Sequence, residues 1–282
     1  MKIYREALRL HAEGYGCKMI ARILSVSPST VGDWIKGRYS PYGPRPPELP
    51  PPRHKPGPKP VELKPTPELA YVIGAVLGDG YASRRGYSFA ITLRAKDREF
   101  VEEFARFMSN VLGGRVRVAL ERSRGRFYAG AYSRALYEVL KKPPQINKLR
   151  PYIEHCTNCT AAFIRGFADA EGSIDHRFGV RIFNTNIELL RYVQRLLARL
   201  DIETTGPRLK TLRGTILRDL RAGKTYLRRR DIYLIRVRAK SIPRFYEDVG
   251  FTIRRKQARP EQCLKRKRKP LPQPFPSIQA FI

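Results

Sequence analysis

Two short stretches of this chain end in a carboxylate that directly precedes a glycine. Residues 72–80 contain Asp79, and residues 164–172 contain Glu171. The two stretches share one nine-residue pattern, in which apolar and small residues precede an acid and a closing glycine. If the two stretches pack side by side, their carboxylates repel each other, and a cation is needed to compensate. A hard divalent cation with oxygen ligands meets this need, so Mg²⁺ is the expected ion.

Each stretch is expected to form a helix that places its acid in the last turn. Thr66 and Pro67 suit the N-cap and the first position of a helix that runs toward Gly80. Thr160 is the expected cap of the second helix, which ends near Gly172. The closing glycine of each copy suits the left-handed conformation that often ends helices.

Small residues recur four positions apart in both expected helices. Gly74 precedes Gly78 in the first, and Gly166 precedes Ala170 in the second. Such a stripe lets two helix backbones approach closely. One copy alone would indicate an ordinary core helix with a capped end. Two copies in one chain favour a shared seam at which the two acids lie side by side.

An internal repeat follows the two stretches. Residues 91–111 align without a gap with residues 180–200. Apolar residues at spacings of one, three and four predict a helix with one buried face in each copy, and the alternation around Ile91 predicts a half-buried strand before it. The order of elements is therefore helix, strands, helix, strands, helix, written twice. Further strands are expected at residues 115–120, 127–131, 208–212 and 232–238.

With both motifs and the repeat in place, the sequence resembles a single-chain LAGLIDADG homing endonuclease over roughly residues 65–250. The resemblance implies an α+β fold of two pseudo-symmetric αββαββα half-domains, whose motif helices form the seam and whose antiparallel sheets bind double-stranded DNA. It implies a site-specific endonuclease of an intron or intein that cuts both strands across the minor groove with Mg²⁺, for which Mn²⁺ can substitute. By position, the metal would be held by Asp79 and Glu171, with Gly78 and Ala170 beside them.

The resemblance also implies a basic residue near the end of the first strand of each half. Lys96 stands there in the first half and is the expected third catalytic residue beside Asp79 and Glu171. Its counterpart is Thr185, and Ala95 replaces a glutamine frequent in similar enzymes, so the two halves differ. The expected mechanism is metal-assisted phosphodiester hydrolysis, with Lys96 supplying positive charge to the phosphate. The alternative is a solvated lysine at a strand end.

The composition independently indicates a polyanionic partner. The formal net charge is +31 over 282 residues, and arginine, whose planar fork suits phosphate and guanine, is the more abundant base. An RNA-binding or ribosomal protein would share this composition. The DNA-binding residues expected in the repeat are Arg84, Arg85, Arg94, Arg115, Arg117, Arg124, Arg126, Arg177, Arg181, Arg208, Lys210, Arg228, Arg230, Arg236 and Arg238.

Residues 1–40 resemble a helix-turn-helix DNA-binding domain. Three short amphipathic helices are expected, the third capped by Ser27, with Val31 and Trp34 directed inward. The alternative is a small helical packing domain that does not contact DNA. The expected outward recognition residues are Ser29, Thr30, Asp33 and Lys36.

The domain order expected from these patterns has five parts. A proline-rich segment, residues 41–64, should act as a semi-rigid spacer after the N-terminal module. The two half-domains are expected at 65–155 and 156–252, followed by a basic, proline-rich tail at 253–282. A monomer with no protein partner is expected.

Cysteine content and hydropathy give weaker indications. Cys156 and Cys159 form a single CxxC beside His155, and without a second pair a local disulfide or buried thiols are favoured over zinc. The chain shows neither a long apolar run nor a charged-then-apolar leader, so a cytoplasmic protein, prokaryotic and archaeal, or another intracellular protein is expected. Abundant proline and arginine indicate a thermophilic source. Besides the endonuclease, two functions stay open: an intron RNA maturase and a DNA-binding regulator with an inactive core.

Overall fold

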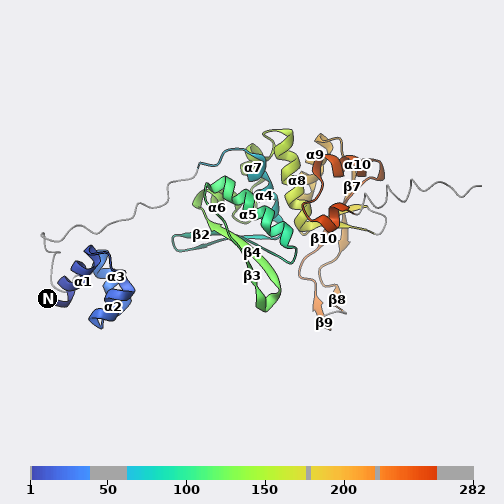
Figure 1. The fold of residues 1–282 in the computed structure, drawn as a ribbon. Coiled ribbons are helices and arrows are strands. Elements are labelled where there is room, and N and C mark those ends of the chain that lie inside the picture. Colours follow the sequence, from blue (N-terminus) through green and yellow to red (C-terminus); the bar gives the residue numbers. More distant parts are fainter. Residues whose placement is uncertain (1, 39–61, 176–178, 220–222, 259–282) are drawn as a thin grey trace, which may run out of the picture. The chain divides into compact units, whose positions relative to one another are not determined.

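A computed structural model describes residues 2–38, 62–175, 179–219 and 223–258 (Figure 1). The chain divides into two units, residues 1–59 and 60–282, each with an apolar core of its own. Most of the expected spacer, the end of the expected tail and Arg177 lie outside the described residues. Within the described ranges, no helix is long and apolar enough to cross a membrane.

The N-terminal unit is a cluster of three helices, α1 (Lys2–Ala12), α2 (Cys17–Leu24) and α3 (Pro28–Ile35). Tyr4 packs edge-on against Trp34, with ring centroids 5.6 Å apart, and Val31 is fully buried beside them. The Ser27 side chain accepts a hydrogen bond from the backbone N–H of Thr30, which caps α3 as the sequence predicts. The unit has the three helices that a helix-turn-helix domain requires, and DNA binding by it stays a prediction.

The first half of the larger unit combines four helices with one antiparallel sheet. The sheet has the strand order β1-β2-β4-β3, and Ile91 and Leu93 of β2 are buried against the helices. The elements are α4 (Pro67–Gly78), β1 (Gly80–Arg85), β2 (Ser88–Ala95), α5 (Arg98–Leu112), β3 (Val118–Glu121), the 3₁₀ turn η1 (Arg122–Arg124), β4 (Arg126–Tyr132), α6 (Arg134–Leu140) and α7 (Ile146–Ile153).

The second half repeats this order, and its sheet has the strand order β5-β6-β10-β7. An additional two-stranded ribbon of β8 and β9 projects from this half in Figure 1. The elements are α8 (Thr157–Glu171), β5 (Gly172–Ile174), β6 (Val180–Asn184), α9 (Ile187–Arg199), β7 (Thr204–Thr211), β8 (Ile216–Asp219), β9 (Lys224–Leu227), β10 (Ile232–Val237), η2 (Ala239–Ser241), α10 (Ile242–Arg244) and the π-helical turn η3 (Phe245–Val249). The predicted α+β fold of two matched halves is confirmed.

The seam between the halves is the packing of α4 against α8. A Cβ atom added to Gly74 would lie 2.2 Å from the Phe163 carbonyl oxygen, and one added to Gly166 would lie 2.3 Å from the Tyr71 carbonyl oxygen. A Cβ on Gly78 would lie 2.4 Å from the Ala170 Cβ. The small-residue stripe therefore meets its counterpart face to face, as the sequence predicts.

Gly166→Ala is expected to lower the free energy of unfolding of the larger unit by about 2 to 3 kcal/mol, because the added methyl group meets rigid backbone. Denaturant unfolding of the purified protein measures this change. Gly114→Ala is the matched control, since a Cβ there meets no atom within 4 Å. Equal stability of the two variants would show that the two helices do not depend on this close approach.

Two local predictions about the motif helices were wrong. Helix α8 begins at Thr157 with Cys156 as its N-cap, because the Cys156 sulfur accepts the backbone N–H of Cys159 at 3.3 Å. Thr160 lies inside the helix, and its hydroxyl donates to the Ile153 carbonyl at 2.9 Å.

The closing glycines are also not in the left-handed conformation. Gly172 has φ −81°, and Gly80 has no positive φ either. Their lack of a side chain is needed for another reason. A Cβ on Gly80 would lie 2.4 Å from the Val76 Cα, and one on Gly172 would lie 2.3 Å from the Ala168 carbonyl oxygen. After each of the two motifs, the backbone turns directly from the helix into a strand and packs against the last helical turn.

The segment that follows residue 252 packs onto the first half. Arg255 donates to both Asp97 carboxylate oxygens, at 2.9 and 2.8 Å, and the Arg254 backbone N–H donates to Glu99 at 2.8 Å. The Lys256 side chain is buried. The folded part of the chain therefore continues to at least residue 258, whereas the sequence placed the start of a tail at residue 253.

Candidate functional site

The structure brings Asp79 and Glu171 to the same end of the parallel pair α4 and α8. Asp79 is the C-cap of α4, and Glu171 is the last residue of α8. A Cβ placed on Gly78 would lie 3.2 Å from the Glu171 Cγ, so the Glu171 side chain rests against the end of α4. The two acids therefore lie at the negative ends of two adjacent helix dipoles, which is unfavourable without a compensating cation.

Burial raises the pKa of both carboxyl groups. The pKa of Glu171 rises to about 7, first because of burial and then because of the Asp79 charge, while a hydrogen bond from Asn184 at 2.7 Å acts in the opposite direction. Burial is also the main cause of the raised pKa of Asp79, opposed by the charges of Lys256 and Arg126. Buried like charges with raised pKa values are typical of functional sites.

The folded protein holds a proton on Glu171 up to about pH 7. The free energy of unfolding of the metal-free protein should therefore fall as the pH rises from 4.5 to 7. Glu171→Gln removes this titration. At pH 8 without divalent ions, we expect the variant to be roughly 1 to 3 kcal/mol more stable than the wild type. At pH 4.5 the two should be equally stable. Urea unfolding in chelator at both pH values tests this difference, and a pH-independent difference would contradict it.

A cavity of about 550 Å³ opens beside Asp79 and crosses the seam between the halves. Lys96 lines this cavity at the end of β2, where the sequence places it. Arg126 from β4 and Ser173 from β5 also line it, so both halves contribute to the cavity. Arg94 lines it as well, so a phosphate group beside Asp79 would meet three basic side chains of the first half.

A second cavity, of about 390 Å³, lies beside Glu171. Its lining includes Thr185, which stands where the first half has Lys96, and the basic residues Lys210 and Arg228. Asn184, which orients Glu171, was not singled out from the sequence. The two acids therefore have different surroundings, as the comparison of Lys96 with Thr185 predicts.

Lys256 is a site residue that the sequence did not reveal. Its ammonium group donates to the Asp169 carbonyl at 2.7 Å and to the Ala168 carbonyl at 3.3 Å, and it lies 5.3 Å from the centroid of the Phe251 ring. Burial lowers its pKa, and the Asp169 charge opposes this effect. Nothing in the basic run of residues 254–256 distinguishes Lys256 from its exposed neighbours, because the distinction arises from packing.

Asp169 connects the seam to the C-terminal segment. Its carboxylate accepts hydrogen bonds from the Tyr71 hydroxyl at 2.8 Å and from the Thr252 backbone N–H at 3.0 Å. The Asp169 side chain is 2% exposed, and burial raises its pKa. These partners give Asp169 a structural role beneath the two motif acids.

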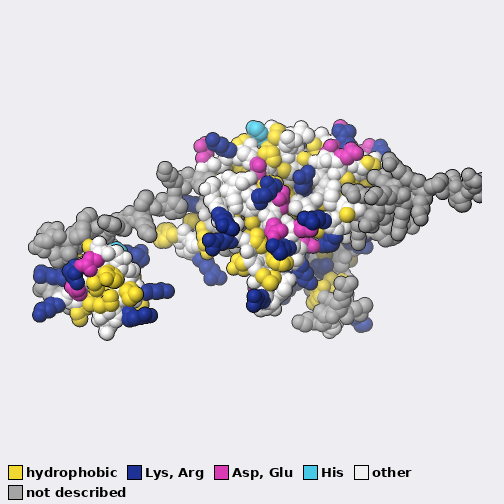
Figure 2. Space-filling view, in the orientation of Figure 1, with side chains coloured by type: hydrophobic (Ala, Val, Ile, Leu, Met, Phe, Trp, Pro, Cys, Tyr) yellow, Lys and Arg dark blue, Asp and Glu magenta, His cyan; other side chains and the backbone are white. Residues whose placement is uncertain are grey.

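The expected DNA-binding residues of the first half do not all share one face of the sheet. Arg94 and Arg85 lie on the face opposite the helices, where Tyr81 and Tyr132 are exposed. Arg84 lies on the other face, with its guanidinium 5.5 Å from the Phe89 ring centroid. Figure 2 shows basic side chains spread over this unit with acidic ones among them. The other arginines of this half that were expected to bind DNA are all exposed: Arg115, Arg117, Arg124 and Arg126.

In the second half, Arg181 and Arg236 are register partners on β6 and β10. Both approach the Asp175 carboxylate, at 3.9 and 3.0 Å. Arg238 is exposed and lies 3.7 Å from Glu203. These three arginines are thus partly neutralised within the protein. The remaining expected residues are Arg208, Lys210 and Arg230, which are exposed, and the half-buried Arg228.

The expected recognition residues of the N-terminal unit lie along α3 and at its end. Ser29 is exposed, and its hydroxyl lies 2.5 Å from that of Ser27. The Thr30 hydroxyl is 3.2 Å from the same Ser27 oxygen, and Asp33 lies 3.9 Å from Arg38. Lys36 is exposed at the C-cap.

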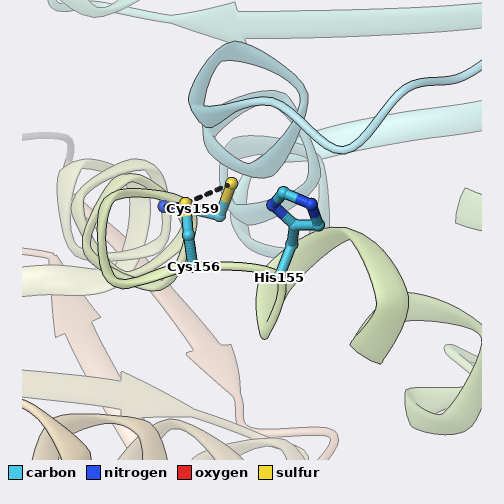
Figure 3. A group of neighbouring side chains, drawn as sticks. All are labelled: His155, Cys156 and Cys159. Atoms are coloured by element: carbon cyan, nitrogen blue, oxygen red, sulfur yellow. Dashed lines mark hydrogen bonds between the residues drawn. The ribbon is translucent and has the colours of Figure 1, made fainter.

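His155, Cys156 and Cys159 form a separate cluster at the opposite end of α8 from Glu171 (Figure 3). Both cysteines are free thiols, with their sulfurs 3.2 Å apart, so the local disulfide considered from the sequence is not present here. Cys159 is buried, whereas His155 and Cys156 are exposed.

Residues 158–250 match a family model described as a LAGLIDADG-like domain. This segment is therefore similar to a LAGLIDADG-like domain. It contains nearly all of α8, Glu171 and the whole second sheet. Helix α4 and the first sheet, outside the matched residues, repeat its order of elements.

Two relatives of this chain come from Methanocaldococcus jannaschii, and both are named as uncharacterised proteins. One is 28% identical over 87% of this chain and 84% of its own length, and the other is 28% identical over 51% and 59%. Among solved structures, the homing endonuclease I-DmoI in complex with DNA and Ca is 20% identical, with a TM-score of 0.48, covering 70% of this chain and 97% of that chain. The N-terminal LAGLIDADG domain of WhiA is 15% identical, with a TM-score of 0.45, covering 67% and 87%.

Proposed function

We propose that this chain is a two-motif LAGLIDADG homing endonuclease, encoded by an intron or intein, that acts as a monomer on double-stranded DNA. The observation that carries the proposal is the placement of Asp79 and Glu171 at adjacent ends of α4 and α8. Buried like charges in this position destabilise the fold unless a cation compensates them. A hard divalent ion, Mg²⁺ with Mn²⁺ as a substitute, would supply that charge.

The donor set fits such an ion. The two carboxyl groups lie at the same end of the seam and interact electrostatically, and Gly78 and Ala170 meet at the adjacent helix ends. Asn184 donates to one oxygen of Glu171, which orients the side chain and leaves its other oxygen available. When bound, the metal would lower the pKa of a water molecule and neutralise charge on the leaving oxygen.

The side chains around the acids perform the remaining steps. Lys96 and Arg126, beside Asp79, bind the phosphate and stabilise its developing negative charge. Lys210 and Arg228 do so beside Glu171. Lys256 holds the last turn of α8 through two carbonyl oxygens, so that the carboxylates keep their positions while DNA binds. Because the two sets of basic residues differ, the two strands are cut at different rates.

The sheet faces opposite the helices supply the DNA-binding surface in this proposal. Arg85 and Arg94 on the first sheet, and Arg208 and Lys210 on the second, bind phosphates and base edges. Exposed tyrosines beside the first pair add apolar contact. The N-terminal unit acts as a helix-turn-helix module on the flanking DNA.

Selection for cleavage from a randomised duplex library with Mg²⁺ tests the proposal and yields the target site. We expect a limited set of sequences cut on both strands with short 3′ overhangs. Binding of a specific duplex without cleavage, in Mg²⁺ or Mn²⁺, would instead indicate a DNA-binding regulator. Tighter binding to a structured intron RNA than to any duplex would indicate a maturase.

A further inference from the structure

The cluster of His155, Cys156 and Cys159 has no part in the proposed cleavage site. It lies at the start of α8, and Glu171 lies at the end, about 22 Å away along the helix axis at 1.5 Å per residue. One possible ligand atom from each of the three side chains lies within 4.8 Å of the others. Figure 3 shows the imidazole ring directed toward the two sulfurs.

Local structure holds these three groups in place. Helix α7 ends at Ile153, and after a short turn Cys156 caps α8. Capping fixes the Cys156 sulfur over the first turn of α8, 3.2 Å from the sulfur of Cys159. The Cys159 side chain is buried between the helices and has little freedom to move. The arrangement is therefore preformed, and no rearrangement of the backbone is needed to bring the donors together.

We propose that His155, Cys156 and Cys159 bind one Zn²⁺ ion. Two thiolates and one imidazole form a borderline-soft donor set that suits Zn²⁺ and does not suit Mg²⁺. In a tetrahedral site with ordinary Zn–S and Zn–N lengths, ligand atoms lie about 3.5 to 4 Å apart. Here the two sulfurs are 3.2 Å apart, and all three ligand atoms lie within 4.8 Å of one another. On binding, two Zn–S bonds form and the two thiol protons pass to solvent.

The exposure of the cluster determines whether water can reach the bound ion. His155 and Cys156 are open to solvent, so the fourth coordination position is accessible to water. The bound ion links the turn after α7 to the first turn of α8, and it therefore stabilises the helix that carries Glu171. Zinc binding does not depend on the proposed nuclease activity, because the two sites share no ligand.

The test uses the full chain in a Cys17→Ser, Cys263→Ser background, so that Cys156 and Cys159 are the remaining thiols. Under reducing conditions, we expect one Zn²⁺ per chain by equilibrium dialysis, and a sulfur-to-metal charge-transfer band with Co²⁺. Zn²⁺ should also raise the midpoint of thermal unfolding. Absence of the Co²⁺ band would overturn the proposal.

Cys156→Ser in this background is the decisive variant. Serine keeps an N-cap acceptor for α8, so the helix is retained while the thiolate is lost. We expect Zn²⁺ affinity to fall by about 100-fold or more and the Co²⁺ band to weaken. His155→Gln should weaken Zn²⁺ binding while keeping part of the band. Unchanged affinity in Cys156→Ser would show that Zn²⁺ binds elsewhere, and the cluster would then be a pair of thiols only.

Discussion

Asp79→Asn is expected to slow DNA cleavage at least about a thousandfold, equivalent to roughly 4 kcal/mol of transition-state stabilisation. The substitution keeps the size and the C-cap position of the side chain but removes one of the two carboxylates at the ends of α4 and α8. The cation then binds weakly, and water activation and leaving-group stabilisation are lost together. DNA affinity should stay within a few-fold of wild type, because one acid is removed from a strongly basic protein.

Single-turnover cleavage of the selected duplex in Mg²⁺ measures this effect. Glu188→Gln is the matched control, because Glu188 is an exposed acid on α9 whose side chain is 63% accessible. Cleavage by that variant should match the wild type. Wild-type rates in Asp79→Asn would remove this residue from the reaction.

Glu171→Gln should produce a loss of cleavage of the same order. Because the two carboxylates act on one cation, the double variant should be hardly slower than either single variant. Multiplicative losses would instead indicate two independent metal sites, one in each cavity. The same Glu171→Gln protein is expected to gain metal-free stability at pH 8, so loss of activity can be separated from loss of fold.

Deletion of residues 1–59 is expected to weaken DNA affinity by about 10- to 1000-fold, the range in which a tethered second module contributes through effective concentration. Each of the two units has an apolar core of its own. The truncated protein should therefore unfold at the same denaturant concentration as the intact larger unit. Its DNA affinity should also depend less steeply on salt, because fewer phosphates are contacted.

Footprinting and salt titration on the selected duplex with flanking DNA measure this change. Lys36→Ala in the full chain is a milder companion variant, because Lys36 is exposed at the end of α3. It should reduce affinity several-fold and leave the folding of both units unchanged. Identical footprint, affinity and salt dependence after deletion would show that the N-terminal unit does not bind this DNA.

The comparison of the two halves shows what local patterns can predict. The apolar positions of α5 and α9 are buried as their spacing predicts, with Phe100 and Phe104 matching Leu189 and Val193. Periodicity is a property of a single element, so it can be read without knowing what covers the element. The strands that directly follow each motif, β1 and β5, were not found, because short strands next to a helix carry little alternation.

Errors arose where a residue's role depends on contacts distant in sequence. The cap of α8 is Cys156 and not the predicted Thr160, because the helix begins one turn earlier than the sequence indicated. Arg84 was grouped with Arg85, although alternation along β1 places neighbours on opposite faces. The closing glycines were assigned to left-handed caps, whereas contact with the preceding turn excludes a side chain there.

The sequence by itself was enough to identify the two acids, the small-residue stripe that brings their helices together, and the internal repeat. It also indicated a basic surface for a polyanionic partner. These features consist of residue types at fixed spacings, and spacing is preserved in any fold that contains the helices. Only the tertiary structure decided that Lys256 is buried under the end of α8, that Asp169 ties the seam to the C-terminal segment, and that His155 faces two thiols. Each of these depends on burial and charge pairing between distant segments, which packing alone sets.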